Sequence, residues 1–282
     1  MINLAFSTNA FKRNSLEQAI DAIAAAGFAG VELMADVPHA YPSSLNSAAR
    51  AALLQRIESH SMTVSNINAF TLFADGDTYH PTWIEPDCSR QKLRIDHTIQ
   101  CLKLAREMKT RTISIQPGGP LIGMGLSRAA ASGRFAAALK QVLPIAQRLE
   151  ITIAIEPEPG LLIQTAVEYL EFKTAYFRKE SHIRMNCDIG HLFCVGEDPG
   201  EVIRSMPREI AHIHLEDIGT NRVHQHLAPG KGAIDFRSIF AALHEIGYAG
   251  WVTVELYPYE MTAAQVAQQA MKYLRPIVKE FA

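Results

Sequence analysis

The chain has 282 residues, of which 48% are hydrophobic and 20% are charged, and its formal net charge is −2 at pH 7. These values are typical of a soluble globular protein and argue against a polybasic nucleic-acid binder, and no apolar run is long enough to span a bilayer. The N-terminal sequence MINLAFSTNAFKRN lacks the charged-then-apolar order of a secretory signal. We therefore expect a cytoplasmic protein without nucleic-acid or membrane partners, whose four scattered cysteines are reduced thiols.

Strand-like and helix-like segments alternate from one end of the chain to the other. The expected strands cover 3–8, 30–35, 63–69, 112–116, 151–157, 183–188, 210–217 and 251–256. The expected helices cover 15–26, 48–59, 90–108, 133–149, 166–176, 199–206, 236–246 and 262–281. Repeated β-then-α units without a linker predict an α/β fold, a closed (β/α)8 TIM barrel that forms a single domain over residues 1–282. A doubly wound open sheet is the alternative, but TNAFKRN after the first strand lacks the glycine-rich phosphate loop of its dinucleotide-binding version.

Two of the connections between these elements are long. Segment 70–88, after the third strand, mixes aromatic and turn residues as an active-site lid does, and segment 117–132, after the fourth, is rich in glycine and alanine. Both follow the C-terminal ends of strands, where barrel enzymes keep their chemistry. A plain surface loop is the alternative for each.

The last four expected strands each carry a polar residue near the C-terminal end, in a phase that allows all four to face the barrel axis. These residues are Glu156, Asp188, His214 and Glu255. Three carboxylates and one imidazole that converge would repel one another unless a divalent cation neutralised them. Mostly oxygen donors with one imidazole fit Mn²⁺, Co²⁺ or Mg²⁺, with Zn²⁺ as a further option. We therefore predict one divalent metal ion held by these four residues; for any single one of them, a helix cap or an arginine partner is the simpler explanation.

Further polar residues follow the same strand ends. His191 lies three residues after Asp188 and binds a substrate oxygen, binds a second ion, or caps the next helix. Glu158 points the same way as Glu156 if the strand stays extended. After the seventh strand, His224 and His226 alternate in a loop, where they either join the site or face solvent.

The seventh strand itself reads IAHIHLEDI, with an aliphatic and a polar face. On the polar face, His214 is the expected ligand. We expect His212, one layer deeper, to be a hydrogen-bonded core imidazole, and Glu216 to lie at the rim, where an arginine or the substrate would satisfy it.

Five motifs occur in a fixed order along the chain: IAIEPEP, NCDIGH, AHIHLED, HQHLAPGKGAIDF and WVTVELYP. In this order and spacing they resemble the xylose-isomerase-like barrel superfamily, which includes sugar isomerases and epimerases, inosose and 3-dehydroshikimate dehydratases, and the endonuclease IV group. The resemblance implies a (β/α)8 barrel with the divalent metal on the four residues predicted above, and a substrate contact from His191. It also implies that a homodimer or homotetramer is an option for the assembly.

The sequence departs from particular branches of that superfamily. Gln116 stands where the endonuclease branch has a histidine before Pro-Gly, and Asn68 and Asn66 stand in a strand where it has another, so a three-metal phosphodiesterase centre looks incomplete. The arginine that epimerases carry after the seventh-strand histidine has no exact match, and Arg222 is the nearest candidate. The residues expected to contact the substrate are therefore His191, Glu158, Asn68, Gln116, Arg222 and His226.

These expectations favour a metal-dependent isomerase or epimerase of carbohydrate metabolism that acts on a sugar, cyclitol or related keto-polyol through an enediolate. Glu156 and Glu255 are the expected catalytic residues, one taking a carbon-bound proton and the other returning one. A metal-dependent dehydratase of the inosose or 3-dehydroshikimate type is the alternative, because an enediolate beside a β-hydroxyl can expel water. Less favoured are a non-catalytic metal-binding barrel and an endonuclease IV-like phosphodiesterase.

Overall fold

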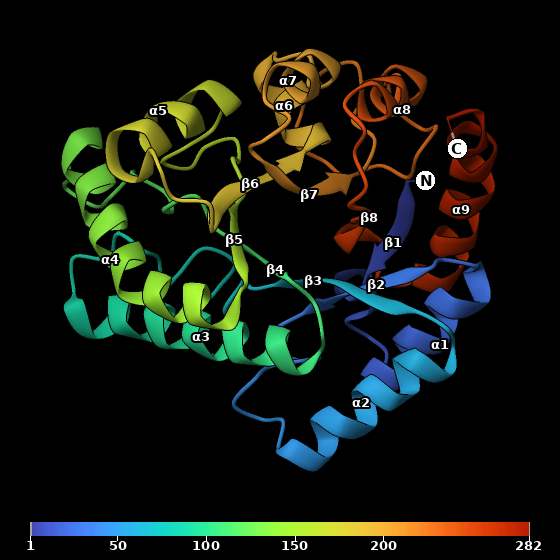
Figure 1. The fold of residues 1–282 in the computed structure, drawn as a ribbon, viewed down its shortest axis with the longest axis horizontal. Coiled ribbons are helices and arrows are strands. Elements are labelled where there is room, and N and C mark those ends of the chain that lie inside the picture. The colour runs from blue at the N-terminus through green and yellow to red at the C-terminus, as the bar shows by residue number, and fades with distance from the viewer. Residues whose placement is uncertain (1, 282) are drawn as a thin grey trace.

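The computed structural model describes residues 2–281 and contains a closed barrel of parallel strands in chain order (Figure 1). The strands are β1 (Asn3–Ser7), β2 (Gly30–Met34), β3 (Thr63–Asn68), β4 (Thr112–Ile115), β5 (Thr152–Ile155), β6 (Ile183–Asp188), β7 (Ile210–Leu215) and β8 (Trp251–Val254). Each strand pairs with the next, and β8 pairs with β1 through the register Leu4 to Val252. The predicted (β/α)8 barrel is confirmed, and closure excludes the open sheet.

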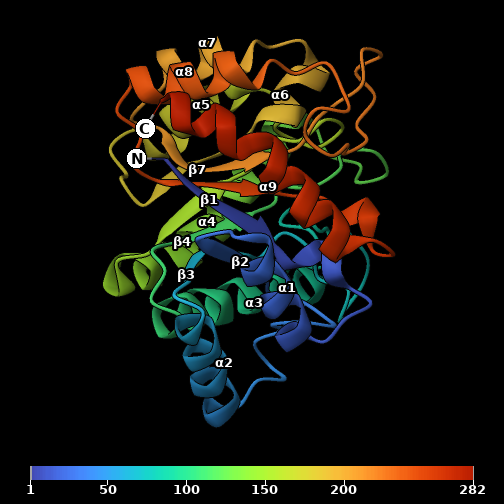
Figure 2. The same cartoon turned by 90° about the vertical axis from the view of Figure 1, so that its right-hand side faces the viewer.

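Helices surround the barrel on its outer side, as the two perpendicular views show (Figures 1 and 2). They are α1 (Leu16–Ala26), α2 (Ser47–Ser59), α3 (Cys88–Glu107), α4 (Arg128–Leu149), α5 (Ala166–Phe177), α6 (Ile189–Val195), α7 (Pro199–Ser205), α8 (Phe236–Glu245) and α9 (Ala263–Glu280). Two short 3-10 helices, η1 (Thr8–Phe11) and η2 (Tyr257–Tyr259), follow β1 and β8. Helix α4 begins five residues earlier than expected, and α6, η1 and η2 were not predicted.

Local capping explains where several of these helices begin and end. Ser15 and Gln18 form a capping box at the start of α1, and Gly27 ends it in the left-handed conformation (φ 89°) that glycine adopts without strain. Asp188 is both the last residue of β6 and the N-cap of α6, because its side chain accepts a hydrogen bond from the backbone N–H of His191. The strand end and the helix start are thus fixed by one carboxylate.

The apolar core lies between the strands and the surrounding helices, whereas polar side chains fill much of the barrel interior. Phe135 of α4 packs on Trp83, in the segment between β3 and α3, and on Phe172 of α5, with ring centroids 5.7 and 5.0 Å apart, which joins the two helices to each other and to that segment. Inside the barrel, His214 of β7 reaches Glu32 of β2 on the far side. The barrel therefore presents polar groups on its inner face and aliphatic groups on its outer face.

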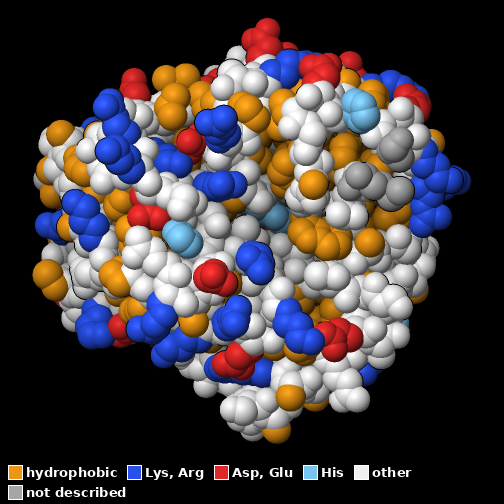
Figure 3. Space-filling model, in the orientation of Figure 1, with side chains coloured by type: hydrophobic (Ala, Val, Ile, Leu, Met, Phe, Trp, Pro, Cys, Tyr) orange, Lys and Arg blue, Asp and Glu red, His pale blue; other side chains and the backbone are white. Residues whose placement is uncertain are grey.

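Within residues 2–281, no helix is long and apolar enough to cross a membrane. On the face seen in Figure 3, Lys and Arg side chains are interspersed with Asp and Glu.

Candidate metal centre

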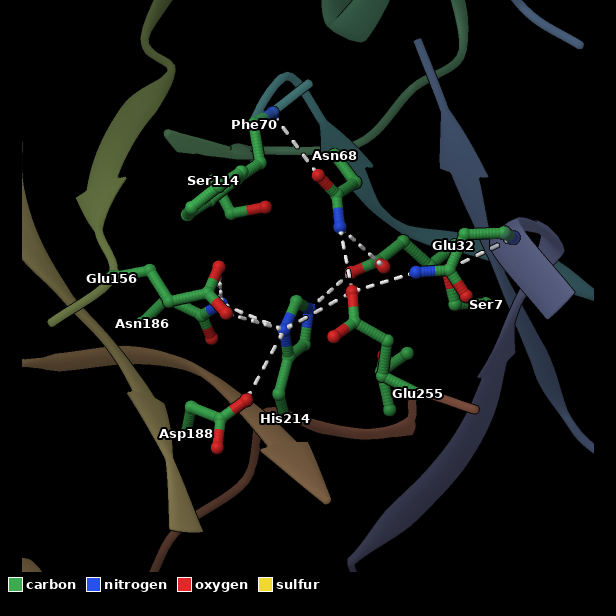
Figure 4. A network of polar contacts seen from close by, with 12 residues as sticks. Ser7, Glu32, Asn68, Phe70, Ser114, Glu156, Asn186, Asp188, His214 and Glu255 are labelled. Carbon is green, nitrogen blue, oxygen red and sulfur yellow. Dashed lines mark hydrogen bonds and ion pairs between the residues drawn. The ribbon is translucent and has the colours of Figure 1, made fainter. Parts of the chain in front are cut away.

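One imidazole lies at the centre of a group of carboxylates at the C-terminal ends of β5 to β8 (Figure 4). His214 Nδ1 lies 3.1 Å from Glu156 Oε1, 3.7 Å from Glu255 Oε1 and 3.9 Å from Asp188 Oδ2. All four side chains are buried, and each offers a ligand atom within 4.8 Å of the others. The structure thus brings together the four residues that the sequence predicted as metal ligands.

The donor set fits a divalent cation. Asp188 Oδ1 accepts the backbone N–H of His191 at 2.8 Å, but the buried Oδ2 has no hydrogen-bond partner among residues 2–281. A buried carboxylate oxygen left unpaired costs free energy that a cation would recover. Burial and the Glu156 carboxylate raise the pKa of Glu255 well above its usual value, which is what carboxylates crowded without a cation do.

Amide donors hold the two glutamates in place. Asn9 Nδ2 and Asn68 Nδ2 both donate to Glu255 Oε1, at 2.8 and 3.0 Å, and Asn186 Nδ2 donates to Glu156 Oε2 at 2.9 Å. These bonds fix the direction in which each carboxylate points. They leave Oε1 of Glu156 toward His214, whereas in Glu255 the oxygen that accepts the amides, Oε1, is also the one nearer to His214.

A cavity of about 360 Å³ opens above this group, a volume within the range of small-molecule sites. Phe70, Phe73 and Tyr79 of the expected lid segment contribute to its wall, and the Tyr79 hydroxyl donates to Glu158 Oε1 at 2.8 Å. Burial raises the pKa of Glu158 to about 7. Of the residues expected to contact substrate, those that line the cavity are Asn68, Glu158, His191 and His226.

Three histidines converge at one side of the cavity. His191 Nδ1 and His226 Nδ1 donate to the backbone oxygens of Pro157 and Glu255, at 3.0 and 2.9 Å, which leaves both Nε2 atoms free in the neutral rings. These Nε2 atoms lie 2.9 and 3.1 Å from His224 Nε2. Three ring nitrogens in this arrangement can hold a cation or receive substrate hydroxyls, so His224 and His226 belong to the cavity region and not to a solvated loop.

Glu216 differs from its expected place at the rim. It is fully buried, and neither carboxylate oxygen has a hydrogen-bond partner among the residues described. Burial and the neighbouring Asp188 raise its pKa well above the usual value. With Asp188 and His226 it forms another group whose ligand atoms lie within 4.8 Å of one another.

Gln116 and Arg222 are not among the residues that line the cavity, so their contact with substrate stays a prediction. Gln116 Nε2 donates to the backbone oxygens of Thr78 and Tyr79, both at 3.1 Å, so the side chain anchors the lid segment. The exposed Arg222 donates to the backbone oxygen of Phe193 and stacks on its ring, with 4.6 Å from the guanidinium carbon to the ring centroid. Both side chains are held by these contacts with other parts of the protein.

The model of the xylose isomerase-like TIM barrel family matches residues 20–277. The chain belongs to this family. It is 26% identical over 292 aligned positions to an inosose dehydratase of Clostridium beijerinckii, covering 94% of this chain and 90% of that protein. Among solved structures it is similar to the IolI protein with a binding zinc atom (TM-score 0.80, 17% identity, 100% and 99% covered). It is likewise similar to L-ribulose 3-epimerase (TM-score 0.79, 22% identity, 100% and 96% covered).

Several residues of the site were not predicted from the sequence. Glu32, Asn9 and Tyr79 contact the predicted ligands or the cavity but do not stand at the C-terminal ends of the last four strands. For Glu32 a signal was present, because it is the one charged residue in the otherwise apolar segment GVELM. A charge in a strand that is buried on both sides requires a partner inside the protein.

Proposed function

We propose that this protein is a divalent-metal-dependent isomerase or epimerase that acts on a sugar, cyclitol or related keto-polyol through an enediolate. The observation that carries the proposal is the convergence of Glu156, Asp188, His214 and Glu255 beneath a cavity of small-molecule size. A divalent ion held by these four residues would supply an electrophile that stabilises charge developing on neighbouring substrate oxygens. Mn²⁺, Co²⁺, Mg²⁺ and Zn²⁺ all suit this donor set.

The two glutamates are the proposed catalytic residues. Both line the cavity, Glu156 after β5 and Glu255 after β8, so they approach a bound substrate from different strands. One accepts the proton from the carbon next to the carbonyl, and the other delivers a proton to the enediolate. The amides of Asn186, Asn9 and Asn68 keep the carboxylates oriented for this transfer.

The other cavity residues bind and enclose the substrate. His191 and His226 present unprotonated Nε2 atoms, close to His224 Nε2, that can accept hydrogen bonds from substrate hydroxyls. The Glu158 carboxylate, beside the Tyr79 hydroxyl, accepts a further hydrogen bond from substrate. Phe70 and Phe73 of the lid segment cover the cavity and exclude water from the reacting carbon.

The second candidate is a metal-dependent dehydratase, and the relatives support it. Inosose dehydratases are similar to this chain over 94% of its length at 26% identity. Dehydration begins with the same proton abstraction, after which His191, protonated on both ring nitrogens, would donate its Nε2 proton to the departing hydroxyl. The two reactions differ in the fate of the enediolate, not in the residues that form it.

Incubation of the metal-loaded protein with candidate keto-polyols in D₂O tests the proposal. Deuterium incorporation with retention of the hydroxyls indicates isomerisation or epimerisation, whereas loss of water and a new conjugated-enone absorbance indicate dehydration. Chelated protein and Glu255→Gln are the controls. Full turnover after exhaustive chelation, or no exchange with any candidate and any of the four ions, would contradict the proposed function.

A further inference from the structure

Glu32 of β2 is a fully buried carboxylate that lies inside the barrel, across from the candidate ligands of β5 to β8 (Figure 4). Its Oε2 lies 2.7 Å from His214 Nε2, the nitrogen on the side of the ring opposite to the carboxylate cluster. The neighbours of Glu32 on the same strand, Val31 and Leu33, are apolar and fully buried. Burying a charged side chain at this position costs free energy unless it is paired, which indicates that Glu32 has a specific role.

Glu32, His212 and His214 offer ligand atoms within 4.8 Å of one another, but the other contacts of Glu32 favour an acceptor of hydrogen bonds over a metal ligand. Asn66 Nδ2 donates to Oε2 at 2.9 Å, and Asn68 Nδ2 donates to Oε1 at 3.2 Å. His212 Nε2 lies 3.4 Å from the same Oε2. Amide N–H groups point at both oxygens of Glu32, so a cation bound there would be repelled by them. A ring N–H of His214, in contrast, would be one more hydrogen-bond donor to the carboxylate.

With a metal bound, the tautomer of His214 follows from which of its two ring nitrogens faces the metal. A neutral imidazole carries one N–H, and the nitrogen that binds a metal must be bare. His214 Nδ1 faces Glu156, Asp188 and Glu255, so it is the metal-facing nitrogen in the proposed site. The ring proton must then sit on Nε2, where Glu32 accepts it.

We infer that Glu32 is a positioning residue which fixes the ring plane and the Nε2–H tautomer of His214, and thereby sets the affinity of the site for its divalent cation. The inference rests on the proposed metal site. Glu32 also links His214 to the second half of the cluster, because Asn68 Nδ2 bonds both Glu32 Oε1 and Glu255 Oε1, at 3.2 and 3.0 Å. Carboxylate partners of this kind change metal affinity by about 10- to 100-fold in other metalloproteins.

The test compares Co²⁺ binding by calorimetry in metal-stripped wild-type protein and Glu32→Gln. Glutamine keeps the shape of the side chain but replaces the carboxylate with a neutral amide, and we expect binding weaker by about 10- to 100-fold. Glu85→Gln is the matched control: Glu85 is also a buried glutamate, but it accepts from the backbone N–H of Thr82, away from the four candidate ligands, and its variant should bind within about twofold of wild type.

Glu32→Asp provides a second variant, since it keeps the charge and withdraws the oxygens by one methylene, about 1.5 Å. It should also weaken Co²⁺ binding, and neither variant should change the visible spectrum of bound Co²⁺ as loss of a ligand would. Independently of any variant, ¹⁵N NMR of the Zn²⁺-loaded wild-type protein should show the His214 proton on Nε2.

The outcomes separate this inference from the function on which it rests. Wild-type protein that binds none of the candidate ions would overturn both. Normal binding by wild type together with binding within twofold in a folded Glu32 variant, or a proton on Nδ1 of His214 in the loaded protein, would overturn the role of Glu32 and leave the proposed reaction standing.

Discussion

His97 of α3 should make the protein sensitive to mild acid, and its surroundings give the size of the effect. The ring is buried, with Nε2 3.4 Å from Cys101 Sγ, and it stacks beside Tyr41 with 6.0 Å between ring centroids. Burial, with the fully buried Arg94 guanidinium nearby, lowers the pKa of His97 to about 3 from 6.5. The folded protein therefore keeps this imidazole neutral over a range in which the unfolded chain accepts a proton.

The direction of the effect follows from proton binding. Below pH 6.5 the unfolded state binds one more proton at His97 than the folded state, so acid favours unfolding until the folded pKa is reached. For a single group with these two pKa values, the free energy of unfolding falls by about 2 kcal/mol between pH 7.5 and pH 5. His97→Gln removes this contribution, since glutamine does not titrate.

Urea denaturation of the chelated wild-type protein and His97→Gln at pH 7.5, 6 and 5 measures the prediction. Chelation prevents metal release from adding its own pH dependence, and the other histidines are common to both proteins and cancel in the comparison. The variant should lose about 2 kcal/mol less than wild type over this range. Parallel curves that differ by less than about 0.5 kcal/mol would show that His97 is protonated in the fold, and the reasoning from burial would then be wrong.

Three further predictions concern the site. Metal at about 100 times its Kd should stabilise chelated protein by about 2.7 kcal/mol and raise the Tm by about 4–5 °C for a chain of this length, by differential scanning fluorimetry; no shift with any ion would refute the site. Glu156→Gln and Glu255→Gln should each lower turnover by about 10²- to 10⁴-fold with an unchanged circular dichroism spectrum, and near-normal turnover in either would remove it from the proton transfer. Gly190→Ala would press a methyl group into the Glu216 carboxylate and should destabilise the protein by about 1–3 kcal/mol in urea, whereas Gly133→Ala in α4, where the nearest atom is 3.8 Å away, should be neutral or stabilising.

The barrel could be predicted because the sequence pattern of a strand followed by a helix is repeated along the whole chain. Eight strands rich in aliphatic residues alternate with helices, and α1 to α8 each begin at a side chain that caps the helix N-terminus. The seven-residue helix α6 was missed because it follows β6 without an intervening loop; Asp188, the last residue of that strand, is also the N-cap that determines where the helix starts. Helix α4 was predicted too short because Ser132 and Gly133 interrupt its start and its first residues continue a glycine-rich segment that resembles a loop, although Ser127 caps the helix.

The positions of the candidate ligands could also be predicted from sequence periodicity, whereas the residues that hydrogen-bond to them could not. Side chains in a strand alternate with period two, so the phase of Glu156, Asp188, His214 and Glu255 places them on the inner face once a barrel is assumed. A contact such as Glu32 with His214 joins residues 182 positions apart, and no local pattern encodes it. The direction of a loop side chain such as Arg222 is equally a product of packing, here on Phe193.

The candidate ligands and the residues that orient them come from different halves of the barrel. The candidate ligands lie at the C-terminal ends of β5, β6, β7 and β8. The residues that orient Glu255 and His214 come from η1, β2 and β3: Asn9, Glu32 and Asn68. Each half of the barrel needs the other. Without the amide and carboxylate partners, the ligand carboxylates would repel one another and turn apart. Without the ligands, the partners would be unpaired polar groups in the core. Pairing of β1 with β8 brings the halves together, so closure of the sheet is a requirement of the site as well as of the fold. Substitutions at the β1–β8 seam should therefore weaken metal binding even where they leave every candidate ligand in place.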